Sequence, residues 1–252
     1  MNEIIPVSDP LDTEAELERL ARRYKAAGGF GIQLLNTLGT GADGLLSRLP
    51  KPVRDQLNDA SRVALTQALG AASKSRGVVP DQAEWLNVTV SAAMGAAGGF
   101  GGLPTALAEL PVTTTLLLRV IEGVAVEHGF DPTTDSVRFD CVQVFAAAGP
   151  LEHDDGSDIA FLTTRLAMSG GAMQKLIAAV APRLAVVLGQ KMAAQTVPVL
   201  GAAAGAAINF SYTKYYTDMA HVHFGVRRLA VEADQTHDAM VDRLRSQVLA
   251  LK

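Results

Sequence analysis

A long uncharged segment, from Trp85 to Ala108, constrains the fold more than any other part of the chain. Its length would allow a transmembrane helix, which needs roughly 20 apolar residues. Its composition favours another use, because small residues predominate and Pro104 lies near its end. Glycine, alanine, serine and threonine bury little apolar surface and gain little from lipid. We therefore expect a tightly packed helical core, or a hairpin that touches a membrane without crossing it.

The composition of the whole chain favours closely packed helices. Hydrophobic residues make up 48% of the sequence but aromatic residues only 5%, so most apolar side chains are small and aliphatic. No segment alternates polar and apolar residues in the way that a half-buried strand does. We predict an all-α fold, a single domain over residues 1–252, with about eight to nine helices around a glycine- and alanine-rich core.

Charge and cysteine content exclude several classes of function. The formal net charge is −4, and the basic residues are scattered, so nucleic acid is not an expected partner. Cys141 is the single cysteine, which excludes an intramolecular disulfide and a CxxC metal site. The first residues lack the basic and apolar regions of a secretory signal, so we expect a cytoplasmic protein.

Capping and breaking residues predict the helix boundaries. Ser8, Asp9 and Pro10 are typical of a helix start, and a charged N-terminal helix over residues 1–27 should stop at Gly28 and Gly29. Further helices are predicted over residues 53–74, 80–97, 112–128, 134–148, 157–168 and 172–190. A short helix should follow Pro104, and the helix over residues 112–128 should stop at Gly129. The last predicted element is a long bent helical region from Pro198 to Leu249.

Two glycine-rich regions, residues 85–128 and 192–230, are predicted to form the central helices. Glycines four apart lie on one face of a helix, where a second backbone can approach closely. The candidate packing or membrane face consists of Gly95, Gly98, Gly99, Gly102, Gly201 and Gly205. The favoured interpretation is that the two regions pack against each other. Asn209, beside the second set, would then need a buried hydrogen-bond partner.

Two sets of polar residues interrupt these apolar regions. Arg119 and Glu122 are three residues apart, which favours an ion pair at the margin of the core over a polar pocket. The second set, here called the polar stripe, would lie along one side of a helix and consists of Asn209, Tyr212, Tyr216, His223 and Arg227. A phenol, an imidazole and a guanidinium could serve acid–base or anion-binding chemistry, but half-buried packing residues are the favoured interpretation.

Two short motifs resemble ligand sites without their usual context. Gly39, Gly41 and Gly44 have the spacing of a dinucleotide fingerprint, but no strand precedes them and too few residues follow for a helix. The acidic segment 152–158 does not match the spacing of a calcium loop. We therefore assign no catalytic residue, no metal and no cofactor.

Three blocks of sequence are similar to the EcsC family of bacterial proteins. The central block is ELPVTTTLLLRVIEGVAVEHG followed by VRFDCVQVFAAAG, the closing block joins GAAAGAAINF to DMAHVHFGVRRL, and LPKPVRDQLNDASRVALTQAL resembles the family more weakly. The family takes its name from a gene beside ABC-transporter components. The resemblance implies work at the inner face of the membrane and supplies no catalytic residues.

These observations favour a non-enzymatic accessory protein of the bacterial cytoplasm, which binds a membrane surface or a membrane-protein partner through the glycine-rich regions. One alternative is an enzyme or a small-ligand protein that uses Arg119 and the polar stripe. Another is a structural homo-oligomer assembled through Gly95, Gly99, Gly201 and Gly205.

Overall fold

The computed structural model describes residues 12–37, 49–76, 89–94, 102–147, 162, 171–195 and 201–251 of the chain. Every regular element in these ranges is a helix, so the all-α prediction is confirmed. The elements are α1 (Thr13–Thr37), α2 (Lys51–Arg76), α4 (Gly102–Glu127), α5 (Asp135–Gln143), the 3₁₀-helix η2 (Val144–Ala146), α6 (Ala172–Gln195), α7 (Gly201–Glu232) and α8 (His237–Ala250). Residues 89–94 are also helical.

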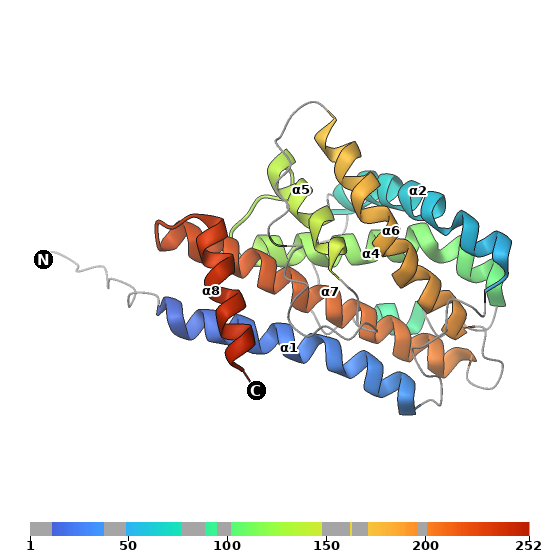
Figure 1. Ribbon diagram of the computed structural model, residues 1–252. Coiled ribbons are helices and arrows are strands. Elements are labelled where there is room, and N and C mark those ends of the chain that lie inside the picture. The colour runs from blue at the N-terminus through green and yellow to red at the C-terminus, as the bar shows by residue number, and fades with distance from the viewer. Residues whose placement is uncertain are drawn as a thin grey trace, which may run out of the picture.

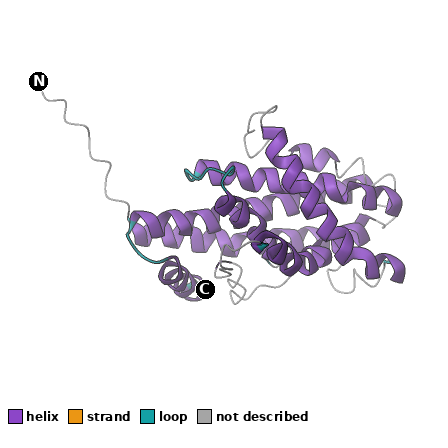
Figure 2. Cartoon of the chain, turned by 90° about the horizontal axis from the view of Figure 1, so that it is seen from above, coloured by secondary structure: helices purple, strands orange, loops and turns teal. Residues whose placement is uncertain are grey.

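The long helices pack side by side in a bundle. α1 lies along α7, and α2 packs on both α4 and α6 (Figure 1). α8 lies across α1 and α7 near the end of the bundle where α7 finishes. The view from above shows the same arrangement of helices without a strand among the described residues (Figure 2). No described helix is both long and apolar enough to span a membrane.

α4 and α7 form the centre of this bundle. Leu118 and Ile121 on α4 are fully buried, as are Tyr216 and Phe224 on α7. Nearly every residue of α7 from 211 to 226 is buried, which is the pattern of a helix surrounded by others. α4 falls within the region 85–128, and α7 begins within the region 192–230.

α4 and α7 run parallel. At the C-terminal end of α4, His128 contacts His221, and Phe130 packs against Phe224 with ring centroids 5.7 Å apart. Because the chain advances by the same rise in both helices, their N-terminal halves also share one end of the bundle. Figure 1 shows the starts of α4 and α7 together at that end, beside the end of α6.

Two predicted helix boundaries are wrong. α1 does not stop at Gly28 and Gly29 but continues to Thr37, although each glycine costs about 1 kcal/mol in a helix. The packing of α1 along α7 outweighs that cost. Pro111 does not begin a new helix, since α4 runs through it from Gly102. Pro111 cannot donate to the carbonyl of Leu107, and packing on α2 and α7 keeps the helix continuous.

Other boundaries agree with the sequence. The region predicted as 53–74 is α2, which begins at Lys51 and ends at Arg76. The stop after α4 is confirmed: Gly129 has a φ of 82°, and the amide of Phe130 donates to the carbonyl of Ala125 at 2.9 Å, as in a Schellman motif. The predicted bend in the last helical region is the turn between α7 and α8. The segments 38–48 and 148–161, which hold the glycine fingerprint and the acidic motif, lie outside the described residues.

Candidate functional site

The tyrosines of the polar stripe belong to the core. Tyr212 is 2% exposed and Tyr216 is fully buried. The ring of Tyr216 meets Phe145 edge to face at a centroid distance of 5.1 Å and Tyr215 at 5.3 Å. Aromatic pairs of this geometry stabilise a core beyond the area that they bury. The structure therefore places both tyrosines in the core, with Tyr216 packed against η2.

The C-terminal end of the polar stripe, His223 and Arg227, binds α5. Arg227 forms an ion pair with Asp140 and donates to the hydroxyl of Ser136 at 3.1 Å. Its guanidinium also lies over the ring of Phe130, 4.5 Å from the centroid. His223 reaches the same carboxylate, with Nε2 3.7 Å from Oδ1 of Asp140. These contacts fix α5 against α7.

The Asp140 carboxylate remains ionised in this environment. Burial opposes its ionisation, but hydrogen bonding and charge interactions with His223, together with the charge of Arg227, outweigh that cost. The pKa of Asp140 is therefore held below its ordinary value. A carboxylate that is already paired with Arg227 and lies beside His223 is a structural anchor between helices.

The N-terminal end of the polar stripe binds the helical residues 89–94. The side-chain amide of Asn209 donates to the carbonyl of Ser91 at 2.9 Å, and Thr213 donates to the hydroxyl of Ser91 at 2.6 Å. The expectation that Asn209 has a buried partner is confirmed. The polar stripe is thus divided among three separate contacts, to residues 89–94, to η2 and to α5.

Arg119 and Glu122 lie where α4 meets its neighbours. Arg119 donates from Nη1 to the hydroxyl of Ser75 on α2 at 2.8 Å, and Glu122 is 1% exposed. Their predicted ion pair stays a prediction. Gly205 is buried on α7, and Gly102 and Gly201 are the first residues of α4 and α7. The remaining glycines of the predicted face, Gly95, Gly98 and Gly99, lie outside the described residues, so that face also stays a prediction.

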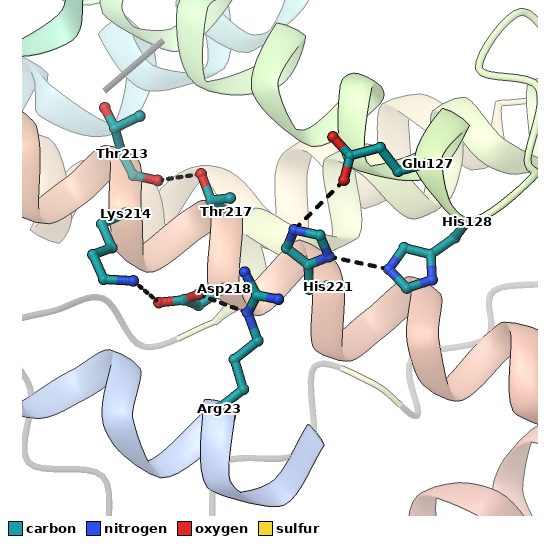
Figure 3. Close-up of polar contacts among 8 residues, drawn as sticks. All are labelled: Arg23, Glu127, His128, Thr213, Lys214, Thr217, Asp218 and His221. Carbon is teal, nitrogen blue, oxygen red and sulfur yellow. Dashed lines mark hydrogen bonds and ion pairs between the residues drawn. The ribbon is translucent and has the colours of Figure 1, made fainter. Parts of the chain in front are cut away.

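A second polar cluster, which sequence reasoning missed, joins three helices (Figure 3). Asp218 on α7 accepts from Arg23 Nε on α1 at 2.7 Å and from Lys214 Nζ at 3.0 Å. The side chain of Asp218 is only 5% exposed, while that of Lys214 is 44% exposed. Removing one partner from a buried pair leaves an uncompensated charge, so this contact holds α1 against α7.

Two histidines form the other half of this cluster. His128 Nε2 lies 3.1 Å from His221 Nδ1, and His221 Nε2 lies 3.8 Å from a carboxylate oxygen of Glu127 (Figure 3). If His128 donates to His221 Nδ1, His221 carries its own proton on Nε2, where it faces Glu127. This tautomer satisfies both contacts, whereas the opposite one would point a lone pair at the carboxylate.

Both rings are neutral at neutral pH. Burial lowers the pKa of His128 to about 4, with help from the positive charge of Arg228. Burial also lowers the pKa of His221 to about 3, and the charge of Arg23 adds to this effect. Such weak bases are poorly suited to general base catalysis, which favours a pKa near the working pH. The pair is a structural contact between α4 and α7.

The sequence carries a partial signal for this cluster. Lys214 and Asp218 are four apart, a spacing that predicts an ion pair on a helix. The other partners, Arg23 and His128, lie 195 and 93 residues away from theirs, so only the fold brings them together. Among the residues that the structure describes, no group of three or more potential ligands could hold a metal ion.

Comparison with known proteins finds one family. A model of the EcsC protein family matches residues 46–229, which is more than two-thirds of the chain. The match includes α2, α4, α5 and α6 and reaches Leu229 in α7, while α1 and α8 lie outside it. No curated protein and no solved structure matches the chain.

Proposed function

The chain belongs to the EcsC protein family, and on that premise we propose that it is a non-enzymatic accessory protein that docks on the cytoplasmic face of a membrane through one end of its helical bundle. The observation that carries this proposal is the distribution of charge along the two central helices. It agrees with the site described above, where the polar side chains hold helices together.

The N-terminal halves of α4 and α7 form what we call the uncharged end. Residues 201–213 of α7 carry no charged side chain, and residues 102–118 of α4 carry only Glu109. The segments adjoining them in sequence, 95–101 and 196–200, are also uncharged. The C-terminal halves hold the charges, namely Arg119, Glu122, Glu127, Lys214, Asp218, Arg227, Arg228 and Glu232.

Along α4 and α7 this asymmetry favours an apolar environment at their N-terminal halves and water at their C-terminal halves. The start of α2, which lies at the same end of the bundle as the start of α4 (Figure 1), adds the exposed charges of Lys51, Arg54 and Asp55. Charged side chains cost several kcal/mol in a bilayer, whereas an uncharged surface can enter the boundary between headgroups and acyl chains. Val112, on the uncharged half of α4, is 51% exposed and would gain from that contact. Since the net charge is −4, binding should not depend on anionic lipid or on low salt.

Vesicle flotation tests the proposal with a matched pair of variants. Wild-type protein should float with phosphatidylcholine vesicles, and about 0.5 M salt should leave the bound fraction unchanged. Val112→Glu should lower the partition coefficient roughly tenfold, which corresponds to about 1.4 kcal/mol. Val231→Glu is the control, because Val231 is also an exposed helical valine, 71% exposed, but lies at the charged end of α7.

Two outcomes would reject membrane docking through this end. The first is wild-type protein that stays at the bottom of the gradient with every vesicle. The second is an equal loss of flotation in the two variants, which would show that the position of the charge does not matter. Flotation only with vesicles containing membrane proteins would replace the lipid surface by a protein partner.

A further inference from the structure

A groove lies between α2 and α6, away from the polar clusters. Its volume is about 240 Å³, and its lining residues are Arg54, Leu57, Asn58, Pro182, Ala185 and Val186. The two helices pack side by side (Figure 1). On each helix the lining residues are spaced by three and four, so each contributes one continuous stripe.

The groove has an apolar floor and a polar rim. Leu57 and Ala185 are 5% and 7% exposed and form the floor, while Arg54 and Asn58 are exposed at the edge. Ala185 leaves space because its side chain is a single methyl group. Pro182 adds an apolar ring to the wall, and its side chain cannot donate a hydrogen bond.

The charge at the rim is positive and uncompensated by the lining. Among the described residues that line the groove, Arg54 is the only charged one. Within the described ranges Arg54 forms no ion pair, whereas Arg62, two turns further along α2, approaches Asp59. The neighbour of Pro182, Arg183, is engaged with the carbonyl of Ala146. A guanidinium without a partner can bind a carboxylate through two parallel hydrogen bonds.

We propose that this groove binds a small monocarboxylate with a short apolar tail, whose carboxylate meets Arg54 and Asn58 while its tail lies on Leu57 and Ala185. At about 240 Å³, the groove has room for a short aliphatic tail and one head group. Hexanoate has this size. So small a ligand in an open groove should bind with a dissociation constant in the millimolar range.

This inference is independent of membrane docking. The described residues that line the groove all belong to α2 or α6. Loss of vesicle binding would therefore leave carboxylate binding in the groove unchanged, and loss of carboxylate binding would leave vesicle binding unchanged.

An NMR titration of the full chain with sodium hexanoate tests the proposal. The backbone amides of residues 54–58 and 182–186 should shift together and saturate. Hexylammonium, which has the same tail and the opposite charge, and acetate, which lacks the tail, should each bind at least tenfold more weakly. Equal binding of hexanoate and hexylammonium, or shifts confined to other residues, would overturn the proposal.

Variants separate the contributions of head and tail. Arg54→Gln should weaken hexanoate binding about tenfold and leave the binding of hexan-1-ol unchanged; Arg62→Gln, on the same helix, should alter neither. Ala185→Leu should fill the floor and abolish binding of both ligands. Arg54 is exposed, so its variant keeps the fold even if Ala185→Leu does not. Equal effects of Arg54→Gln and Arg62→Gln would contradict a carboxylate contact at Arg54.

Discussion

Mild acid should destabilise this protein through the contact between His128 and His221. In the folded chain both rings resist protonation, with pKa values of about 4 and about 3. In the unfolded chain each ring has the ordinary value near 6.5. Below about pH 6.5 the unfolded state therefore binds more protons than the folded state, and stability falls as the pH falls. The loss continues until the pH passes the two folded pKa values.

The size of the effect follows from the shifts. Between neutral pH and pH 5 the unfolded rings gain protons over about 1.5 pH units, while the folded rings stay neutral, at about 1.36 kcal/mol per unit. This gives an upper limit of ~2 kcal/mol for each ring. Water still reaches both rings in part, so we take about half of that limit. Through this histidine pair, the change from neutral pH to pH 5 should thus lower the unfolding free energy by ~2 kcal/mol.

Urea unfolding at about pH 7 and about pH 5 measures this loss. The double variant His128→Gln, His221→Gln keeps hydrogen-bonding side chains that do not titrate, and it retains every other ionisable group. Between these two pH values, the unfolding free energy of the wild type should fall by ~2 kcal/mol more than that of the double variant. If the two proteins lost the same free energy, the histidine pair would not be the source of acid sensitivity, and its assignment as a buried neutral pair would be wrong.

Two further predictions concern the backbone. A Cβ at Gly225 would lie 2.8 Å from Cδ2 of Leu20, so Gly225→Ala should destabilise the contact of α1 with α7 by about 1–3 kcal/mol, whereas Gly123→Ala, with nothing within 4 Å, should be neutral or stabilising. Thermal unfolding checks both, and equal shifts of the midpoint would contradict the packing. Asp234 has a φ of 51° at the end of α7, so Asp234→Gly should raise stability by about 0.5–1 kcal/mol, and a lower unfolding midpoint would contradict that reading.

Local signals in the sequence predicted the parts of the fold that local physics determines. α2 follows a regular apolar repeat, and α4 ends at Gly129 because only glycine adopts that positive φ without strain. The absence of alternating patterns and the wealth of small residues were enough to predict an all-helical core. Asn209 was expected to need a buried partner, and it binds Ser91.

Long-range packing determines what the sequence could not predict. The predicted stop at Gly28 ignored the support that α7 gives to α1, and Pro111 appeared to begin a helix because its neighbours in space were unknown. No local pattern in the sequence singled out His221. Its actual partner, His128, lies at the end of α4. The residues of the polar stripe were predicted to share one side of a helix, but their partners lie on three different elements.

A fluorescent label at either end of the bundle tests membrane docking most directly. Cys141 is fully buried, so a cysteine introduced at Val112 or Val231 can be labelled selectively with an environment-sensitive dye. On addition of phosphatidylcholine vesicles, the label at position 112 should brighten and shift to the blue, because it enters the interface, while the label at position 231 should not change. An unchanged label at position 112, or an equal response at both positions, would contradict docking through the uncharged end.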